Sequence, residues 1–161
     1  MTAARVLELL ASDGRTLAVA ESLTGGLLAD AFVQVPGASA VLLGGVVAYA
    51  TPVKHTLLGV DGDLLDREGP VDPDVAKQMA DGVRRAVAVD GRSADIGVST
   101  TGVAGPEAQG GKPPGTVWVG VAVGERRIAR SAVLPGDRAA VRQGAVLLAL
   151  DALLEALEQS E

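Results

Sequence analysis

The stretch Leu-Ala-Val-Ala-Glu-Ser-Leu-Thr-Gly-Gly, at residues 17–26, constrains the fold of this chain more than any other. Its first four residues form a short apolar run, which is typical of a buried strand. The Thr-Gly-Gly run precedes an apolar segment over 27–35 that predicts a helix. A strand-to-helix turn leaves backbone N–H groups without intrahelical partners, and glycine lets a ligand approach that backbone closely. Ser22 therefore lies where a hydroxyl can be both exposed and directed at a ligand.

The remainder of the chain alternates between helical and strand patterns. Helices are predicted over 2–12, 27–35, 73–89 and 138–158, with a short one after Thr51-Pro52, and strands over 16–20, 40–50, 94–100, 116–123 and 126–134. Residues 59–69 are expected to be a loop with one helical turn. The alternation predicts a three-layer α/β/α domain around a mixed β-sheet. Without an internal repeat or a linker, the pattern favours a single domain over 1–161.

Composition and charge exclude several classes of function. The chain carries a net charge of −6 and has one Phe, one Trp and one Tyr, which argues against a nucleic-acid surface. It has no Cys and one His, so thiolate chemistry is excluded and no metal site is expected. No apolar run is long enough to span a membrane and no leader is recognisable at the start, so we expect a soluble cytoplasmic protein.

An acyl-transfer reaction at Ser22 requires a base, because a serine hydroxyl reacts poorly alone. His55 and Lys54 are adjacent candidates, and successive helical residues point about 100° apart, so both rarely face one site. A neutral lysine at pH 7 costs about 4.6 kcal/mol at its reference pKa, and burial reduces that cost. The apolar strand at 40–50 precedes Lys54 and is expected to bury it. Tyr49, at the end of this strand, is placed to hydrogen-bond either partner.

Structural roles for the same side chains remain open at the level of sequence. Ser22 is also a good helix cap, which is the commonest role of a serine before a helix. Lys54 and His55 also fit the exposed face of a short helix, and Tyr49 fits a core position. The Glu21 carboxylate is placed to face the positive end of the following helix.

Two glycine-rich segments, at 24–26 and 101–105, each follow a predicted strand. Ligands of α/β folds bind beyond the carboxyl ends of strands, so the two segments are candidates for one cleft. Their N–H groups suit a phosphate or a carbonyl oxygen. Neither segment has the Walker A or the Gly-x-Gly-x-x-Gly pattern, and both also fit ordinary turns. Arg138 and Arg142 are candidate phosphate partners.

Five stretches together resemble one known family, the CinA C-terminal domain, whose stand-alone members include nicotinamide-nucleotide amidohydrolases. The stretches are Ala-Glu-Ser-Leu-Thr-Gly-Gly at 20–26, Gly-Gly-Val-Val-Ala-Tyr at 44–49 with Lys54 after it, Thr-Gly-Val-Ala-Gly-Pro at 101–106, Pro-Gly-Thr-Val-Trp at 114–118, and Pro-Gly-Asp-Arg at 135–138 with Arg142 after it. Each is modest alone, but five in the order and spacing of the family are specific.

The resemblance implies hydrolysis of the carboxamide of nicotinamide mononucleotide to nicotinate mononucleotide and ammonia. It implies Ser22 as the nucleophile, Lys54 as its base and Tyr49 as an assisting hydroxyl. The substrate-binding residues that it implies are Thr24, Gly25, Gly26, Thr101, Gly102 and Gly105, with Arg142 for the phosphate.

The resemblance also implies that the chain needs neither a metal nor an organic cofactor, and that it forms a homodimer. We expect a free-standing form of the domain. Two alternatives stay open at this point. One is a non-catalytic nucleotide-binding or regulatory module with the same pocket, and the other is a different hydrolase that uses His55.

Overall fold

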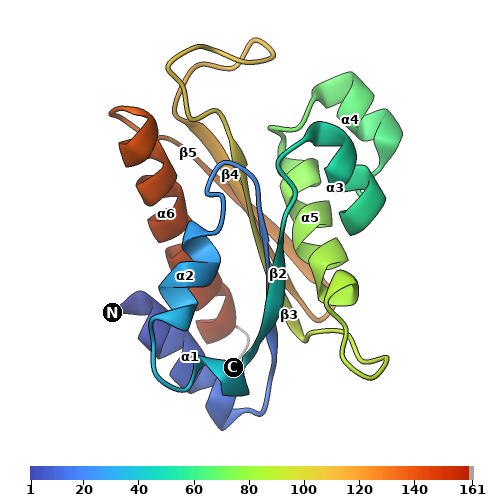
Figure 1. Cartoon of the computed structure of the whole chain (residues 1–161), viewed down its shortest axis with the longest axis vertical. Helices are drawn as coiled ribbons and strands as arrows, with labels where there is room; N and C mark the ends of the chain where they lie inside the picture. Colours follow the sequence, from blue (N-terminus) through green and yellow to red (C-terminus); the bar gives the residue numbers. More distant parts are fainter. Residues whose placement is uncertain (160–161) are drawn as a thin grey trace.

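The computed structural model describes residues 1–159 and shows a five-stranded sheet between two layers of helices (Figure 1). The elements are α1 (Thr2–Ser12), β1 (Leu17–Glu21), α2 (Leu27–Val33), the 3-10 helix η1 (Ala38–Ala40), β2 (Leu42–Val47), α3 (Thr51–Leu58), α4 (Gly62–Glu68), α5 (Pro73–Ala86), β3 (Ile96–Gly102), β4 (Thr116–Val123), β5 (Arg126–Val133) and α6 (Arg138–Glu158). Among these residues, no helix is long and apolar enough to cross a bilayer.

The sheet is mixed, with strand order β2-β1-β3-β4-β5. β1 lies between two parallel neighbours, β2 and β3, while β4 runs antiparallel to both β3 and β5. All five residues of β1 are buried, as a central strand with helices on both faces requires. The carboxyl ends of β1 and β3 therefore lie side by side, and the predicted three-layer α/β/α fold around a mixed sheet is confirmed.

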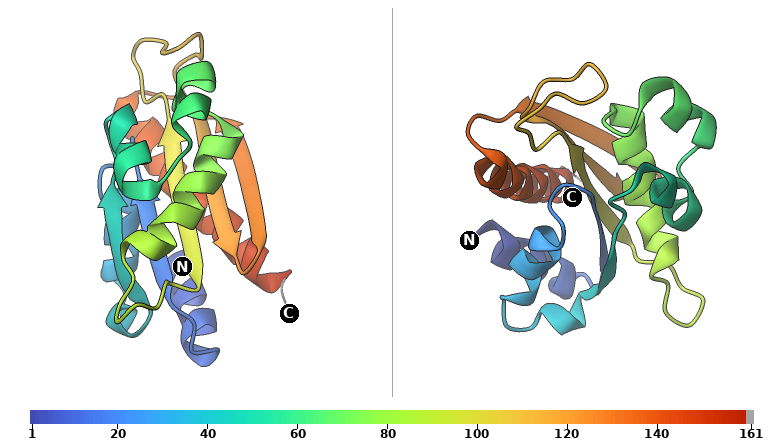
Figure 2. Two further views of the ribbon diagram at one scale, coloured as in Figure 1. Left: turned by 90° about the vertical axis from the view of Figure 1, so that its right-hand side faces the viewer. Right: turned by 45° about the horizontal axis from the view of Figure 1, so that its top comes forward.

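Each face of the sheet has its own apolar core. Helices α1, α2 and α6 cover one face, and α3, α4 and α5 cover the other (Figures 1 and 2). Phe32 and Leu153 are fully buried in the first core, and Met79 and Val83 in the second. Burying an apolar side chain of this size stabilises a fold by about 1.5–3 kcal/mol.

Helix α5 packs unusually close to the sheet because two glycines face it. A Cβ at Gly97 would lie 1.8 Å from the carbonyl oxygen of Ala80, and one at Gly120 would lie 2.2 Å from that of Ala76. Because the helix lies so close to β3, the Ser99 hydroxyl can donate to the Ala76 carbonyl at 2.6 Å. The second core is therefore thin and closely packed beside β3.

Two sequence-based predictions about secondary structure are wrong. The strand predicted over 40–50 is shorter, because η1 occupies 38–40 and β2 ends at Val47, just before Tyr49. Residues 59–69, predicted as a loop with one turn, contain the seven-residue helix α4. Asp61 begins this helix by accepting a hydrogen bond from the N–H of Asp63 at 2.9 Å, a capping signal that the prediction overlooked.

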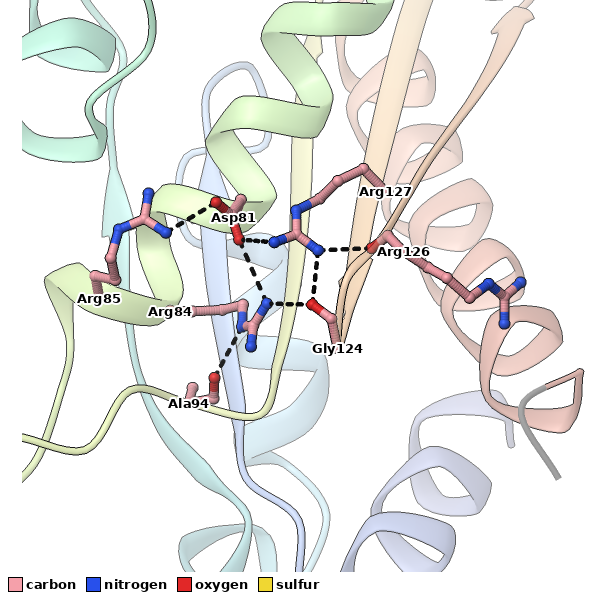
Figure 3. Close-up of polar contacts among 7 residues, drawn as sticks. All are labelled: Asp81, Arg84, Arg85, Ala94, Gly124, Arg126 and Arg127. Atoms are coloured by element: carbon pink, nitrogen blue, oxygen red, sulfur yellow. Dashed lines mark hydrogen bonds and ion pairs between the residues drawn. The ribbon is translucent and has the colours of Figure 1, made fainter.

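A cluster of charged side chains ties α5 to the turn between β4 and β5 (Figure 3). The Asp81 carboxylate pairs with Arg85 at 2.8 Å, Arg84 at 3.3 Å and Arg127 at 2.5 Å. Arg84 and Arg127 also donate to the Gly124 carbonyl, at 3.1 and 2.7 Å. Burial alone would raise the pKa of Asp81, but the hydrogen bond from Arg85 and the three guanidinium charges outweigh it and hold this pKa below its usual value.

Replacing Asp81 with Asn should lower the free energy of unfolding by about 2 kcal/mol, because three guanidinium groups lose their shared counter-charge. Urea denaturation at pH 7 measures the change. The pKa of Asp81 is lower in the folded than in the unfolded protein, so its contribution is complete above pH 4 and disappears as the pH falls through the folded value.

The matched control is Glu8→Gln, which removes a carboxylate from an exposed pair with Arg5 on α1. That change should alter the free energy of unfolding by less than about 0.5 kcal/mol. Equal effects of the two substitutions would mean that the Asp81 cluster contributes no more than an ordinary surface pair.

Candidate active site

The turn that carries Ser22 is fixed to the helix that follows it by a buried carboxylate. Glu21 is 1% exposed and is the last residue of β1. Its two oxygens accept hydrogen bonds from the N–H groups of Leu28 at 2.8 Å and Ala29 at 3.1 Å, in the first turn of α2. The negative charge therefore lies at the positive end of the helix, where it is favoured. Ser22 directly follows this fixed residue.

Two other elements hold the same turn. The hydroxyls of Thr24 and Thr100, which is on β3, lie 2.8 Å apart, and the N–H of Ser22 donates to the Thr100 hydroxyl at 3.4 Å. From α6, Arg142 donates to the carbonyls of Leu23 at 2.8 Å and Thr24 at 3.3 Å. Contacts from β3 and α6, together with the Glu21 carboxylate, therefore position Ser22.

Lys54 on α3 is 1% exposed, and its amine reaches the Ser22 hydroxyl. The Nζ atom lies 2.9 Å from the Ser22 Oγ, 2.7 Å from the Ala48 carbonyl oxygen and 3.3 Å from the Tyr49 carbonyl oxygen. An ammonium group can donate to all three acceptors. A neutral amine can donate to the two carbonyls and direct its lone pair at the Ser22 hydroxyl.

Burial lowers the pKa of Lys54 from its ordinary value of 10.5 to about 8. The low dielectric around the amine disfavours its charged form. With a pKa near 8, about one lysine in ten is neutral at pH 7, compared with about one in three thousand at the ordinary value. The structure therefore gives Lys54 the protonation equilibrium that a general base needs.

His55 occupies the neighbouring position on α3 and faces elsewhere. Its Nδ1 atom lies 2.7 Å from the Val60 carbonyl oxygen, and its ring is not part of the cavity beside Ser22. The expected 100° between successive helical residues accounts for this difference from Lys54. His55 therefore makes no contact with Ser22 or the cavity, whereas the alternative hydrolase that uses His55 would require one.

Ser22 and Lys54 lie in one wall of a cavity of about 510 Å³ at the carboxyl ends of β1 and β3. The cavity is also lined by Tyr49, by residues 101–109 and by Arg138. In Figure 2 the loop that follows β3 rises beyond the edge of the sheet. The predicted Thr101, Gly102 and Gly105 therefore lie with Ser22 and Lys54 around a single cavity.

Some predicted substrate-binding residues shape the turn and do not line the cavity. Gly25 and Gly26 have φ angles of +55° and +107°, which glycine adopts without strain, and the Thr24 hydroxyl is engaged with Thr100. Arg142 has its guanidinium on backbone carbonyls of the turn, as described above. The side chains of Thr24 and Arg142 and the two glycines therefore position the turn, and the predicted contacts of these four residues with substrate stay a prediction.

The cation that lines the cavity is Arg138, one helical turn before Arg142 on α6. It donates to the Gly105 carbonyl at 2.7 Å and to the Tyr49 hydroxyl at 3.1 Å. The Tyr49 side chain is 61% exposed and bonds to Arg138, so its hydroxyl touches neither Ser22 nor Lys54. Only the backbone carbonyl of Tyr49 contacts Lys54, which corrects the expected hydrogen bond from the side chain.

Thr100 and Glu107 were not predicted as parts of the site, whereas the suggested role of Glu21 as a carboxylate at the start of the following helix agrees with its contacts. The Ser-Thr-Thr run at 99–101 was the available signal for Thr100, because adjacent hydroxyls at the end of a strand point to opposite faces. Within residues 1–159, no group of three or more His, Asp or Glu side chains is arranged to hold a metal ion.

Comparison with known proteins places this chain in a family. The model of the CinA C-terminal domain matches residues 1–157. A CinA-like protein of Frankia casuarinae is 51% identical over 146 residues, which cover 91% of this chain and 33% of that protein. A putative competence-damage inducible protein of Caldanaerobacter subterraneus is 44% identical over 156 residues, or 95% of this chain and 36% of that protein. The chain thus spans about a third of the length of these curated relatives.

Solved structures give the same result. A CinA superfamily protein from Klebsiella pneumoniae superposes with a TM-score of 0.91 at 31% identity, covering 98% of this chain and 96% of that one. A competence/damage inducible protein from Agrobacterium tumefaciens has a TM-score of 0.84 at 30% identity, with 98% and 96% covered. From its sequence match and its fold together, the chain belongs to the CinA C-terminal domain family.

Proposed function

We propose that this domain hydrolyses the carboxamide of nicotinamide mononucleotide to nicotinate mononucleotide and ammonia, with Ser22 and Lys54 as a catalytic dyad. The observation that carries the proposal is the 2.9 Å contact between the Ser22 Oγ and the buried Lys54 Nζ at the wall of a cavity. The substrate itself comes from the resemblance to nicotinamide-nucleotide amidohydrolases. The contact supports amide hydrolysis in general, because a serine next to a neutral amine is an activated nucleophile.

In the proposed reaction, neutral Lys54 takes the proton from Ser22 as the serine oxygen attacks the carboxamide carbon. The carbonyl oxygen becomes an oxyanion, and the protonated lysine then delivers its proton to the leaving ammonia. A water molecule, deprotonated by Lys54, attacks the resulting ester and frees the acid and the serine. The two carbonyls that accept from Lys54 keep the amine aligned through both halves of the reaction.

The proposed donors to the oxyanion are backbone N–H groups directly after the nucleophile. In the part of the chain that the structure describes, the N–H groups of Leu23 and Thr24 meet no protein acceptor. The N–H of Gly25 already donates to the Ser22 carbonyl at 3.2 Å. The proposed oxyanion donors are therefore the N–H groups of the two residues before this glycine. Each such donor typically lowers the barrier of an acyl transfer by about 3 kcal/mol.

Arg138 is the proposed partner of the substrate phosphate, since its exposed guanidinium lines the cavity away from the fully buried Lys54. Its hydrogen bonds to Gly105 and Tyr49 hold it at the rim. A guanidinium group binds phosphate oxygens in a bidentate manner and keeps its charge at all relevant pH values.

Substituting either member of the dyad should abolish ammonia release without unfolding the chain. Ser22→Ala and Lys54→Met should each lower kcat/KM for nicotinamide mononucleotide at least about a thousandfold, because nucleophile and base act as a unit. A coupled ammonia assay measures the rate, and circular dichroism checks the fold. His55→Ala is the control and should retain near-normal turnover. Binding of the mononucleotide without any ammonia release by the wild-type chain would favour a non-catalytic binding module.

Activity should rise with pH through the pKa of Lys54. The base must be neutral, so kcat/KM should increase about tenfold per pH unit below pH 7 and level off above about pH 8, the pKa that burial gives Lys54. A pH profile between 6 and 9 measures it, and NMR titration of the Lys54 side chain should give the same midpoint. A rate that is flat between pH 6 and 8 would contradict the role of Lys54 as the base.

Removing the Arg138 charge should weaken binding only of substrates that carry the phosphate. Arg138→Met should raise KM for nicotinamide mononucleotide about tenfold, because the phosphate loses a charge-assisted partner. The corresponding riboside, which lacks the phosphate, serves as the matched substrate and should change by less than twofold. Equal changes for the two substrates would show that Arg138 acts only by supporting the loop at Gly105.

A further inference from the structure

The rim of the cavity carries two opposite charges. Among the residues that the structure describes, Glu107 is the carboxylate and Arg138 the guanidinium that line this cavity, and both side chains are exposed. Lys54 is neutral in the form that acts as a base. Without Glu107 the cavity would therefore be cationic, and it would disfavour any part of a ligand that carries a positive charge.

Glu107 is carried by a loop whose base and far side are both attached. At its base, the N–H of Gly115 donates to the Val103 carbonyl at 2.8 Å, and Arg138 donates to the Gly105 carbonyl. On the far side, the Lys112 amine reaches the Glu68 carbonyl at the end of α4, at 3.0 Å. These contacts fix the path of the loop on both sides of Glu107.

The proposed substrate has a charge distribution that this rim matches. Its nicotinamide ring is a pyridinium cation, and its phosphate is an anion at the other end of the ribose. With the carboxamide at Ser22, the ring would lie beside Lys54 and the phosphate would extend toward the exposed rim. A carboxylate in the same cavity would offset the repulsion that the ring meets from Arg138.

We propose that Glu107 is a specificity-determining residue that selects ligands with a positively charged pyridinium ring over ligands with a neutral ring. The inference rests on the proposed function for the identity of the substrate, but it concerns binding and does not require turnover. In chemical terms, Glu107 would favour binding of the oxidised mononucleotide over the reduced one. The reduced form has a neutral dihydropyridine ring but the same ribose and phosphate.

The test measures binding in the whole 161-residue chain with Ser22→Ala, which lacks the proposed nucleophile and leaves both ligands intact. Calorimetry gives Kd for oxidised and reduced nicotinamide mononucleotide, with and without Glu107→Gln. The substitution should weaken binding of the oxidised form about tenfold and that of the reduced form less than twofold. Raising the salt concentration to 0.5 M should shrink the difference, because the pair is exposed to solvent.

Glu125→Gln provides the matched control, since this exposed carboxylate lies in the turn between β4 and β5 and outside the cavity. It should leave both affinities unchanged. An equal loss for both ligands on Glu107→Gln would overturn the proposal, because Glu107 would then act on the shared ribose or phosphate. Unchanged affinities would overturn it as well.

Ammonia release by the wild-type chain separates this inference from the proposed function. Selectivity for the charged ring that depends on Glu107, in a chain that releases no ammonia, would refute the amidohydrolase and support the role of Glu107. Ammonia release with no such selectivity would refute the role of Glu107 alone. A chain that binds neither mononucleotide would refute both.

Discussion

The site depends on one unfavourable placement, a lysine amine buried where its charge is poorly solvated. The shift of its pKa from 10.5 to about 8 corresponds to about 3 kcal/mol that the fold must offset when Lys54 is protonated. The close packing of α5 against the sheet and the apolar core around α3 provide that stability. Two backbone carbonyls then accept from the amine, so it is buried without being left unpaired. The lowered pKa of the amine is thus a consequence of packing.

A base is useful only if the hydroxyl beside it stays in place, and this explains the number of contacts on the turn. Glu21 fixes the turn to α2, Thr100 fixes it to β3, and Arg142 fixes it to α6. Three elements that are distant in the sequence therefore determine one position. Positional errors of about 1 Å reduce catalysis by orders of magnitude, so side chains that never touch a substrate would still affect the proposed reaction.

The sequence was most informative where local patterns carry the information. The apolar run before Glu21 and the glycines after it define a strand, a turn and a helix, and Lys54 was a candidate base with a reason for its burial. Local patterns could not show that Arg138, and not Arg142, lines the cavity, since the two lie on the same face of one helix. They also could not show the contact of Thr100 with the turn, because residues 78 positions apart meet only through the sheet.

The charges of the cavity and of the whole chain act at different ranges. A net charge of −6 repels a phosphorylated ligand at a distance, but ions screen that repulsion beyond about 8–10 Å. Within this range the local groups decide, and these are Lys54 in the wall, which is uncharged in the form proposed as the base, and Arg138 and Glu107 on the rim. In the proposed binding mode, with the carboxamide at Ser22, Arg138 would meet the phosphate of the ligand and Glu107 its cationic ring. The same charges that would favour such a ligand would then also help to orient the bond to be cleaved.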